Sequence, residues 1–390
     1  MAESTTTSTP SQTTASTPTT TAPAPAPAPA VTTTAEPKGL LLKADAIANQ
    51  FRAEVQSSLG RAERKPKLVG ILATSSAPSK SYAEFTRRQC EELGFEFVLR
   101  KVGAALNSVG EGGGGGEVLG EGEGVEEAIV EANEDGSVDG IMVYFPIFGA
   151  QQDHYLQQIV SPLKDVEGLH FKFHYNLYHN IRFLDPKSLL TATPSTGTPL
   201  TSTSTDTDQP PAGMVKSIIP CTPLAIVKCL EYVGVYNKIL PYGDRAYGRT
   251  VTVINRSEVV GRPLAALLAN DGARVLSVDI DSIQEYTKRP RVASNPASSS
   301  GEENVKARYH PRHVVHASGL SLRECLAVSD VVVSAVPSAG YKVKTEWLKD
   351  GCVCLNVAAE KNFEKDVRDK ASIYVPAVGK VTILMLLRNL

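Results

Sequence analysis

The sequence predicts an α/β protein with two domains, in which a Rossmann-type domain with a parallel sheet is joined to a second α/β domain. Helical segments alternate with short β-branched runs along most of the chain, which is typical of a parallel sheet covered by helices on both faces. The chain has 390 residues, enough for two domains, and 42% of them are hydrophobic, enough for a core in each.

The individual elements follow from hydrophobic spacing and from the residues that punctuate it. Gly94 ends one predicted helix, and Pro223 suits the first turn of another. Helices are predicted over 42–59, 81–93, 125–133, 224–233, 261–271 and 320–328, and strands over 67–74, 95–101, 140–144, 250–255, 274–279, 330–335 and 352–357.

Four segments of biased composition interrupt this alternation. Residues 1–37 are almost entirely Thr, Ser, Pro and Ala, which cannot bury enough apolar surface to fold, so they predict a disordered arm. Residues 111–124 are rich in Gly and Glu, 191–213 in Thr, Ser and Pro, and 290–304 in Ser and Asn. Each of these three lies between periodic stretches, so we predict insertions in surface loops.

Charge and hydropathy exclude several classes of partner. A net charge of −2 and a pI near 6.4 give no sign of a nucleic-acid or membrane partner. No run of 18 apolar residues is present, so no membrane span is predicted. The amino-terminal arm lacks the apolar core of a secretory signal and the arginines of a mitochondrial presequence. The predicted compartment is the cytoplasm.

The cysteines and histidines do not form a pattern that indicates a metal site. Six scattered cysteines are too few for a disulfide scaffold, and Cys352 and Cys354 lie in an apolar strand, which predicts buried free thiols. His170, His174 and His179 are spaced like possible ligands, but no Cys or Glu cluster accompanies them. We therefore predict that the protein binds no metal.

The most informative segment runs from Thr250 to Asp279. It contains a strand, the turn N-R-S-E-V-V-G-R-P, a helix, and a second strand that ends in an acidic residue. A dinucleotide site needs a tight turn at a helix amino terminus and an acidic residue for the ribose. Gly261 and Asp279 are 18 positions apart, which fits this spacing. Asn255 replaces an early glycine of the motif, so a βαβ unit without a nucleotide remains the alternative.

Several ordered motifs resemble those of the methylenetetrahydrofolate dehydrogenase family. The segment from Gly248 to Leu268 is similar to the family's strand, G-R-S-x-x-V-G-x-P turn and helix. The remaining motifs agree in order: K-S-Y at 80–82, V-D-G-I to Pro146 at 138–146, K-D-V-E-G at 164–168, I-P-C-T-P at 219–223 and V-P-A-V-G-K-V-T at 375–382. The resemblance covers residues 42–390 apart from the insertions.

The resemblance implies a fold and an activity. It implies a folate-binding catalytic domain, placed here at 38–220 and completed by 371–390, and an NAD-binding domain at 221–370, with the active site in the cleft between them. It also implies a homodimer with a role in one-carbon metabolism that supports purine synthesis. Tyr82 would stack on the folate, and Glu167 and Pro376 lie in matching substrate motifs. A half-buried helix tyrosine is the alternative for Tyr82.

Two departures from the family pattern predict that cyclohydrolase activity is absent. Bifunctional relatives have Y-x-x-x-K, whereas Thr86 stands four residues after Tyr82, and the neighbouring Arg87 points about 100° away on a helix. Tyr144 replaces the family's glutamine. The sequence therefore resembles the monofunctional NAD-dependent branch known in fungi. Hydride transfer needs mainly the positioning of two rings, so it would survive these losses.

Asp279 favours NAD over NADP, because its carboxylate would bond the ribose 2′-hydroxyl and repel a 2′-phosphate, and Asp281 adds to that repulsion. Arg256 would favour NADP if its guanidinium held the 2′-phosphate. The alternative is that Arg256, together with Ser257, contacts the pyrophosphate or the adenosine side of the cofactor. The remaining residues predicted to line the cofactor site are Gly261, Ile280, Ala335 and Val336.

Cys221 is the best side-chain candidate near the chemistry, because it lies between Pro220 and Thr222 where folate and nicotinamide would meet. A packed small thiol is the alternative. The alternative functions are an NADP-linked member of the family, an inactive NAD- or folate-binding regulator, and a dehydrogenase of amino or hydroxy acids. The last would need a charged anchor and a base near the hydride centre, and no such pair is evident. Assays of turnover distinguish the others.

Overall fold

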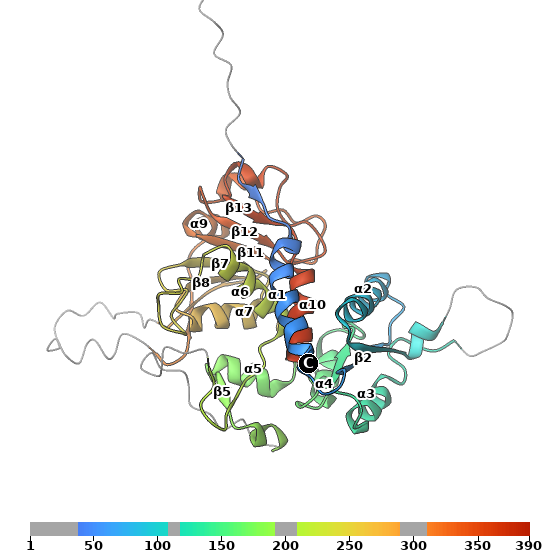
Figure 1. Ribbon diagram of the computed structural model, residues 1–390. Helices are drawn as coiled ribbons and strands as arrows, with labels where there is room; N and C mark the ends of the chain where they lie inside the picture. Colours follow the sequence, from blue (N-terminus) through green and yellow to red (C-terminus); the bar gives the residue numbers. More distant parts are fainter. Residues whose placement is uncertain (1–37, 108–117, 192–208, 289–309) are drawn as a thin grey trace, which may run out of the picture. The chain divides into compact units, whose positions relative to one another are not determined.

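The computed structural model describes residues 38–107, 118–191, 209–288 and 310–390 (Figure 1). The predicted arm at 1–37 and most of the three predicted insertions lie outside these ranges. The carboxyl-terminal part of the first insertion is described: residues 118–124 lead into a helix, and the Gly122 N–H donates to the Ala73 carbonyl at 2.9 Å. Among the described residues, no helix is long and apolar enough to cross a bilayer.

A sheet of eight strands forms the larger structural layer, in the order β1-β13-β12-β11-β7-β8-β9-β10. The sheet has six parallel strands and an antiparallel pair, β9 and β10, at one edge. The strands are short, and most of their residues in the centre of the sheet are buried. The parallel strands are β1 (Leu40–Leu41), β7 (Thr250–Ile254), β8 (Arg274–Val278), β11 (Val331–Ser334), β12 (Val353–Asn356) and β13 (Ile373–Val375), and the antiparallel ones are β9 (Ile283–Thr287) and β10 (Val314–Ala317).

An antiparallel edge pair, β9 and β10, adds to the predicted parallel sheet. The turn at 279–282 is short, and a short connection can return the chain only antiparallel to β8, since a parallel neighbour needs a longer crossover. The sequence analysis did not predict β9 or β10, which pair with each other across the segment at 289–309. The helices predicted beside β7, β8 and β11 are present: α7 (Gly261–Asn270) and α9 (Leu322–Val328).

The smaller sheet has three parallel strands in the order β3-β2-β4, with β2 (Lys67–Leu72) in the centre. The outer strands are β3 (Glu96–Lys101) and β4 (Gly140–Val143). Its helices are α2 (Ala77–Leu93), α3 (Val125–Glu134) and α4 (Ala150–Ile159), and a two-stranded ribbon of β5 (Phe183–Leu184) and β6 (Val215–Lys216) follows α5 (Phe171–Tyr178). The sequence patterns did not predict α4, α5 or the ribbon.

Helices from distant parts of the chain pack side by side around the main core. In Figure 1, α1 (Ala44–Leu59, blue) lies along α10 (Gly379–Asn389, red), and α10 also contacts α6 (Cys221–Tyr232). Positions 383–387 of α10 are all buried, as expected for a helix surrounded by protein. One hydrophobic cluster therefore includes residues of both sheets.

The predicted domain boundaries stay predictions, because residues 38–390 group as one unit. Within that unit, β13 is a strand of the large sheet, where it pairs with β12 and β1. Of the segment 371–390, the helix α10 is the part that contacts α1, α2 and α6.

Candidate active site

A turn that follows β7 has the backbone geometry of a nucleotide-binding loop. Asn255, at the position of the missing glycine, adopts a left-handed backbone with φ of 82°, a conformation that Asn tolerates better than most residues. Its side-chain amide donates to the Ala335 carbonyl at 2.7 Å and so joins the ends of β7 and β11. Asn255 therefore provides the turn that glycine usually provides.

Gly261 allows the helix that follows to approach this turn closely. A Cβ at this position would lie 1.7 Å from the Asn255 carbonyl oxygen, so no other residue fits without movement. The hydroxyl of Ser257 accepts hydrogen bonds from the N–H groups of Val260 and Gly261 at 3.3 and 3.4 Å. The amino terminus of α7 is thus held beside the strand end, as a phosphate-binding turn requires.

A cavity of about 770 Å³ opens at the carboxyl ends of the parallel strands. Asp279, Ile280 and Val336, three of the predicted cofactor residues, lie in its wall together with Asn255. Ile280 is 96% exposed, which is unusual for an isoleucine. A flat aromatic ligand bound in the cavity would cover this side chain. Ligands of α/β sheets bind at this edge of the strands, so the cavity is a candidate dinucleotide site.

Arg256 is engaged by its own protein. Its Nε and Nη2 donate to the hydroxyl and carbonyl of Ser277 at 3.0 and 2.7 Å, and Nη1 and Nη2 donate to the hydroxyl and carbonyl of Ser282 at 3.0 and 2.9 Å. The guanidinium therefore braces the turn that carries Asp279. Because all three of its nitrogens have partners, this arrangement favours a cofactor with a free 2′-hydroxyl.

Two asparagines that sequence reasoning missed support the loop after β11, whose Val336 lines the cavity. Asn362 accepts from the Val336 N–H at 2.9 Å and donates to the Val336 carbonyl at 2.9 Å, which holds the loop after β11. Asn356 donates to the Pro376 carbonyl at 3.3 Å and accepts from the Asn362 N–H at 2.9 Å. The bonds to Val336 and Pro376 join residues 20 or more positions apart, so no local pattern in the sequence could have revealed these roles.

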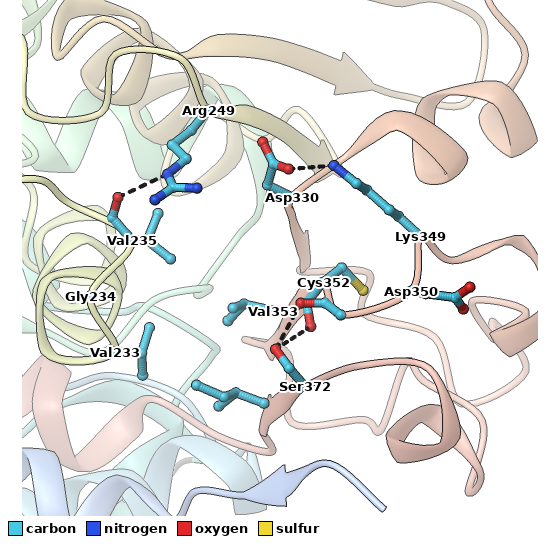
Figure 2. Close-up of a pocket in the computed structure, with 12 residues that line it drawn as sticks. Val233, Gly234, Val235, Arg249, Asp330, Lys349, Asp350, Cys352, Val353 and Ser372 are labelled. Carbon is cyan, nitrogen blue, oxygen red and sulfur yellow. Dashed lines mark hydrogen bonds and ion pairs between the residues drawn. The ribbon is translucent and has the colours of Figure 1, made fainter.

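A second cavity, of about 360 Å³, lies at the opposite, amino-terminal edge of the same sheet (Figure 2). Its charged groups are matched in number, two basic and two acidic, and Lys349 donates to Asp330 at 2.6 Å. Asp330 also accepts from the Thr250 N–H at 2.9 Å. Cys352 lies in this wall with its sulfur 3.7 Å from that of Cys354, and all six cysteines are buried and free. This cavity is at the edge that nucleotides do not use.

Two of the three substrate residues predicted from the family motifs, Tyr82 and Glu167, lie near the end of β4 in the smaller sheet, whereas Pro376 follows β13 of the large sheet. The rings of Tyr82 on α2 and Tyr144 after β4 meet edge to face, with centroids 6.2 Å apart. The side-chain carboxylate of Glu167 accepts a hydrogen bond from the Val143 N–H at 3.1 Å. The backbone carbonyl of Glu167 accepts one from the Cys221 N–H at 3.0 Å. Strand β4, the loop at 164–168 and the start of α6 are thereby connected.

Burial raises the pKa of each acidic side chain in this group. Burial, and then the nearby Asp165 carboxylate, raise the pKa of Glu167 to about 8. Burial also raises the pKa of Asp165, to about 6, although this carboxylate accepts three backbone hydrogen bonds. Burial and then Glu167 raise the pKa of the Cys221 thiol above its usual value. Cys221 is therefore a protonated thiol near neutral pH, which makes it a poor nucleophile.

Thr86 and Tyr144 form an apolar environment where bifunctional relatives would have a lysine and a glutamine. Thr86 is fully buried, and its hydroxyl donates to the Tyr82 carbonyl at 2.9 Å. The Tyr144 hydroxyl is buried without a hydrogen-bond partner among the described residues, and burial raises its pKa. Arg87 ion-pairs with Glu84 and Glu91 on the surface of α2. It does not substitute for the missing lysine.

The histidines considered as metal ligands have other contacts. His170 caps α5 by accepting from the Lys172 N–H at 3.2 Å, and His179 stacks on Tyr175 with ring centroids 3.9 Å apart. Burial lowers the pKa of His174 to about 4. Among the residues that the structure describes, no three His, Cys, Asp or Glu side chains form a group that could hold a metal ion.

Comparison with known proteins decides the family. The catalytic-domain model "Tetrahydrofolate dehydrogenase/cyclohydrolase, catalytic domain" matches residues 42–167, and the corresponding NAD(P)-binding domain model matches residues 220–294. The chain belongs to the tetrahydrofolate dehydrogenase/cyclohydrolase family. These two matches cover both the group around Tyr82 and the turn around Gly261.

Relatives with established names are similar over nearly their whole length. A methylenetetrahydrofolate dehydrogenase [NAD(+)] of Schizosaccharomyces pombe is 44% identical over 348 residues, 89% of this chain and 90% of that protein. The Saccharomyces cerevisiae protein of the same name is 43% identical, over 90% of this chain and 95% of that protein. The solved structure of the S. cerevisiae NAD-dependent enzyme covers 90% of this chain and 96% of its own, with a TM-score of 0.72 and 42% identity.

Proposed function

We propose that this protein oxidises 5,10-methylenetetrahydrofolate with NAD to 5,10-methenyltetrahydrofolate, and that it has no cyclohydrolase activity. The observation that carries the proposal is the pair of Thr86 and Tyr144, both buried, where hydrolysis would need a lysine and a glutamine. The NAD-dependent names of the relatives from both yeasts support it. The activity supports one-carbon metabolism and, through it, purine synthesis.

NAD fits the larger cavity on the chemistry of its wall. Asp279 lines the cavity and accepts one hydrogen bond, from the Ile280 N–H at 2.9 Å, which leaves its other carboxylate oxygen for the ribose hydroxyls. Ser257 and Gly261 hold the helix terminus for the pyrophosphate, and Ile280, Ala335 and Val336 supply the surrounding walls. Bound NAD supplies the hydride acceptor, and Arg256 acts by bracing the Asp279 turn.

The folate is placed by residues of the smaller sheet and by α6. Tyr82 offers a ring face to the folate, and Pro376 limits the site beside Asn356. Because its pKa is about 8, Glu167 is mostly protonated near pH 7 and can donate a hydrogen bond to a ring nitrogen or oxygen. Cys221, Thr86 and Tyr144 provide a surface without a general base, which disfavours attack by water.

We also infer a homodimer in the cytoplasm, and a folate-binding domain at 38–220 that 371–390 completes beside the NAD-binding domain at 221–370. The homodimer and the domain limits rest on the family, and the compartment rests on the composition of the amino-terminal arm. Light scattering of the purified chain tests the dimer. A mass of one chain, at concentrations that saturate activity, would contradict it.

Absorbance assays test the activity directly. The protein is incubated with methylenetetrahydrofolate and either NAD or NADP, and the methenyl product is then followed for hydrolysis against buffer alone. NADH formation without accelerated hydrolysis is the expected result. A preference for NADP or clear hydrolysis would contradict the monofunctional NAD assignment, and the absence of any turnover would favour a binding protein without catalysis.

A further inference from the structure

A third cavity, of about 590 Å³, lies apart from the residues assigned above. It is bounded by α6, by the loop at 236–245, by the segment at 216–219 and by the end of α10. None of the proposed NAD or folate residues lines it. Its volume lies within the range of small-molecule sites, roughly 300–1,000 Å³.

The wall of this cavity is strongly basic in a chain whose net charge is −2. Two carboxylates, Glu231 and Asp271, line it. The cations in the wall are Arg182, Lys216, Lys228, Lys238, Arg245 and Arg388. Six positive charges against two negative ones leave a local excess of four, which would concentrate an anionic ligand.

Part of this excess is neutralised by carboxylates among the described residues. Lys228 pairs with Glu231 at 2.8 Å, and Arg388 pairs with Glu54 of α1 at 2.9 Å. Lys238 and Arg245 have no carboxylate within ion-pair distance among the described residues. Two cations in one concave wall therefore remain available to a ligand.

The interior of the cavity is built around a buried arginine. Arg182 is 8% exposed, donates from Nη2 to Asp271 at 2.8 Å and donates from Nε to Asn180 at 3.0 Å. The Tyr236 hydroxyl donates to the other oxygen of Asp271 at 2.9 Å, which satisfies that carboxylate. No described residue accepts a hydrogen bond from Nη1 of Arg182, so a fixed guanidinium lines the cavity with a donor to spare.

An aromatic ring completes the site. The guanidinium carbons of Arg182 and Arg245 each lie 5.6 Å from the centroid of the Tyr242 ring, a distance typical of cation–π contacts. The ring therefore orients both guanidinium groups, and a planar fork of donors suits phosphate or carboxylate oxygens.

We propose that this cavity, which we call the basic cavity, binds a small polyanion that carries at least two phosphate or carboxylate groups. Arg182 and Arg245 contact one group of the ligand, and Lys238 contacts another. Such a ligand has two possible sources: a free phosphate-bearing metabolite, or the multiply charged glutamate tail of the folate itself. The Ile218–Ile219 segment in the wall leads directly to Cys221, so the second source is compatible with the proposed substrate position.

Calorimetry on the full chain saturated with NAD tests binding, with tripolyphosphate as the probe. NAD occupies the pyrophosphate turn, so phosphate binding there does not contribute. The test variant is Lys238→Gln with Arg245→Gln, which leaves the buried Arg182–Asp271 pair intact. The control is Arg323→Gln with Lys365→Gln, which removes the same charge at two exposed positions away from the cavity. We expect one equivalent to bind the wild type, at least 10-fold weaker binding to the variant, and less than a 2-fold change in the control.

A second experiment distinguishes a free anion from the glutamate tail of the folate. It rests on the proposed dehydrogenase activity, whereas the calorimetry needs no activity. The KM of each protein is compared for methylenetetrahydrofolate with one glutamate and with five. A 5-fold or greater rise in the variant for the pentaglutamate alone identifies the substrate tail as the ligand. Tripolyphosphate binding without that rise identifies a free anion. The proposal is overturned by two results together. The first is that the wild type does not bind tripolyphosphate, or that the variant and the control bind it equally. The second is that the KM for the pentaglutamate is the same in the variant as in the wild type.

Discussion

Replacing Gly261 with alanine tests the structural basis of the nucleotide turn. The added Cβ would lie 1.7 Å from the Asn255 carbonyl oxygen, and real Cβ atoms essentially never approach closer than 3.0 Å. The helix terminus and the turn must therefore separate by about 1.3 Å. The obstacle is backbone, which cannot rotate away as the end of a long side chain can.

Two consequences follow from that displacement. Overpacking of a well-filled site costs about 1–3 kcal/mol of the free energy of unfolding. A misplacement of about 1 Å at a positioning element can lower the rate about 100-fold. We therefore expect Gly261→Ala to lower kcat/KM for NAD by roughly two orders of magnitude, with a moderate loss of stability.

The assay is NADH formation at several NAD concentrations, together with denaturant unfolding of the same samples. Gly340→Ala is the matched control, because its Cβ would meet only the Ser338 hydroxyl, at 3.9 Å, an ordinary contact. The control should resemble the wild type in both measurements. A Gly261→Ala protein with wild-type kcat/KM for NAD would refute the argument that close approach at this turn positions the cofactor.

Three further predictions concern the cofactor and the substrate group. Asp279→Asn should lower kcat/KM for NAD about 10-fold or more, because hydrogen bonds to charged groups contribute about 1.5–3 kcal/mol. It should also narrow the preference for NAD over NADP. An unchanged ratio of kcat/KM for NAD to kcat/KM for NADP would contradict this role. Tyr144→Phe removes a buried hydroxyl without a partner, so denaturant unfolding should show a gain of about 1 kcal/mol, whereas a loss of that size would indicate a hidden hydrogen bond. The pKa of Glu167 is raised in the folded protein, so its contribution to the free energy of unfolding is fully present below about pH 4.5 and is lost as the pH rises through about 8. Glu167→Gln should therefore gain stability relative to the wild type as the pH rises from 5 to 9. We also expect the KM for the folate to rise above pH 8 in the wild type and not in this variant. Parallel pH profiles of the two proteins would exclude this titration.

The sequence predicted the regular part of this fold because its signals are local. A β-branched run at 250–255 and the helix pattern at 261–271 can each be recognised within a dozen residues, and the structure has β7 and α7 there. By contrast, β9 and β10 pair across the segment at 289–309, and Leu40 of β1 pairs with Ile373 of β13 from the other end of the chain. No local pattern encodes such pairings.

The candidate site divides in the same way. Short motifs in the sequence predicted site roles for Tyr82, Glu167, Cys221, Gly261 and Asp279, and these roles stay predictions. The roles of Arg256, Asn356 and Asn362 could not be predicted, since each depends on hydrogen bonds to groups that the fold brings near. The sequence left Arg256 open between a phosphate contact and an adenosine contact, whereas in the structure it holds Ser277 and Ser282.

The sequence by itself therefore determined the class of fold, the residues available for binding and the absence of the Y-x-x-x-K lysine, since these depend on residue identity and spacing. The tertiary structure alone decided which charges are neutralised, which carboxyl groups stay protonated and where cavities remain. A pKa depends on burial and on neighbouring charges, and these are fixed only when distant segments pack together. The neutral Glu167 and the basic cavity are both consequences of that packing.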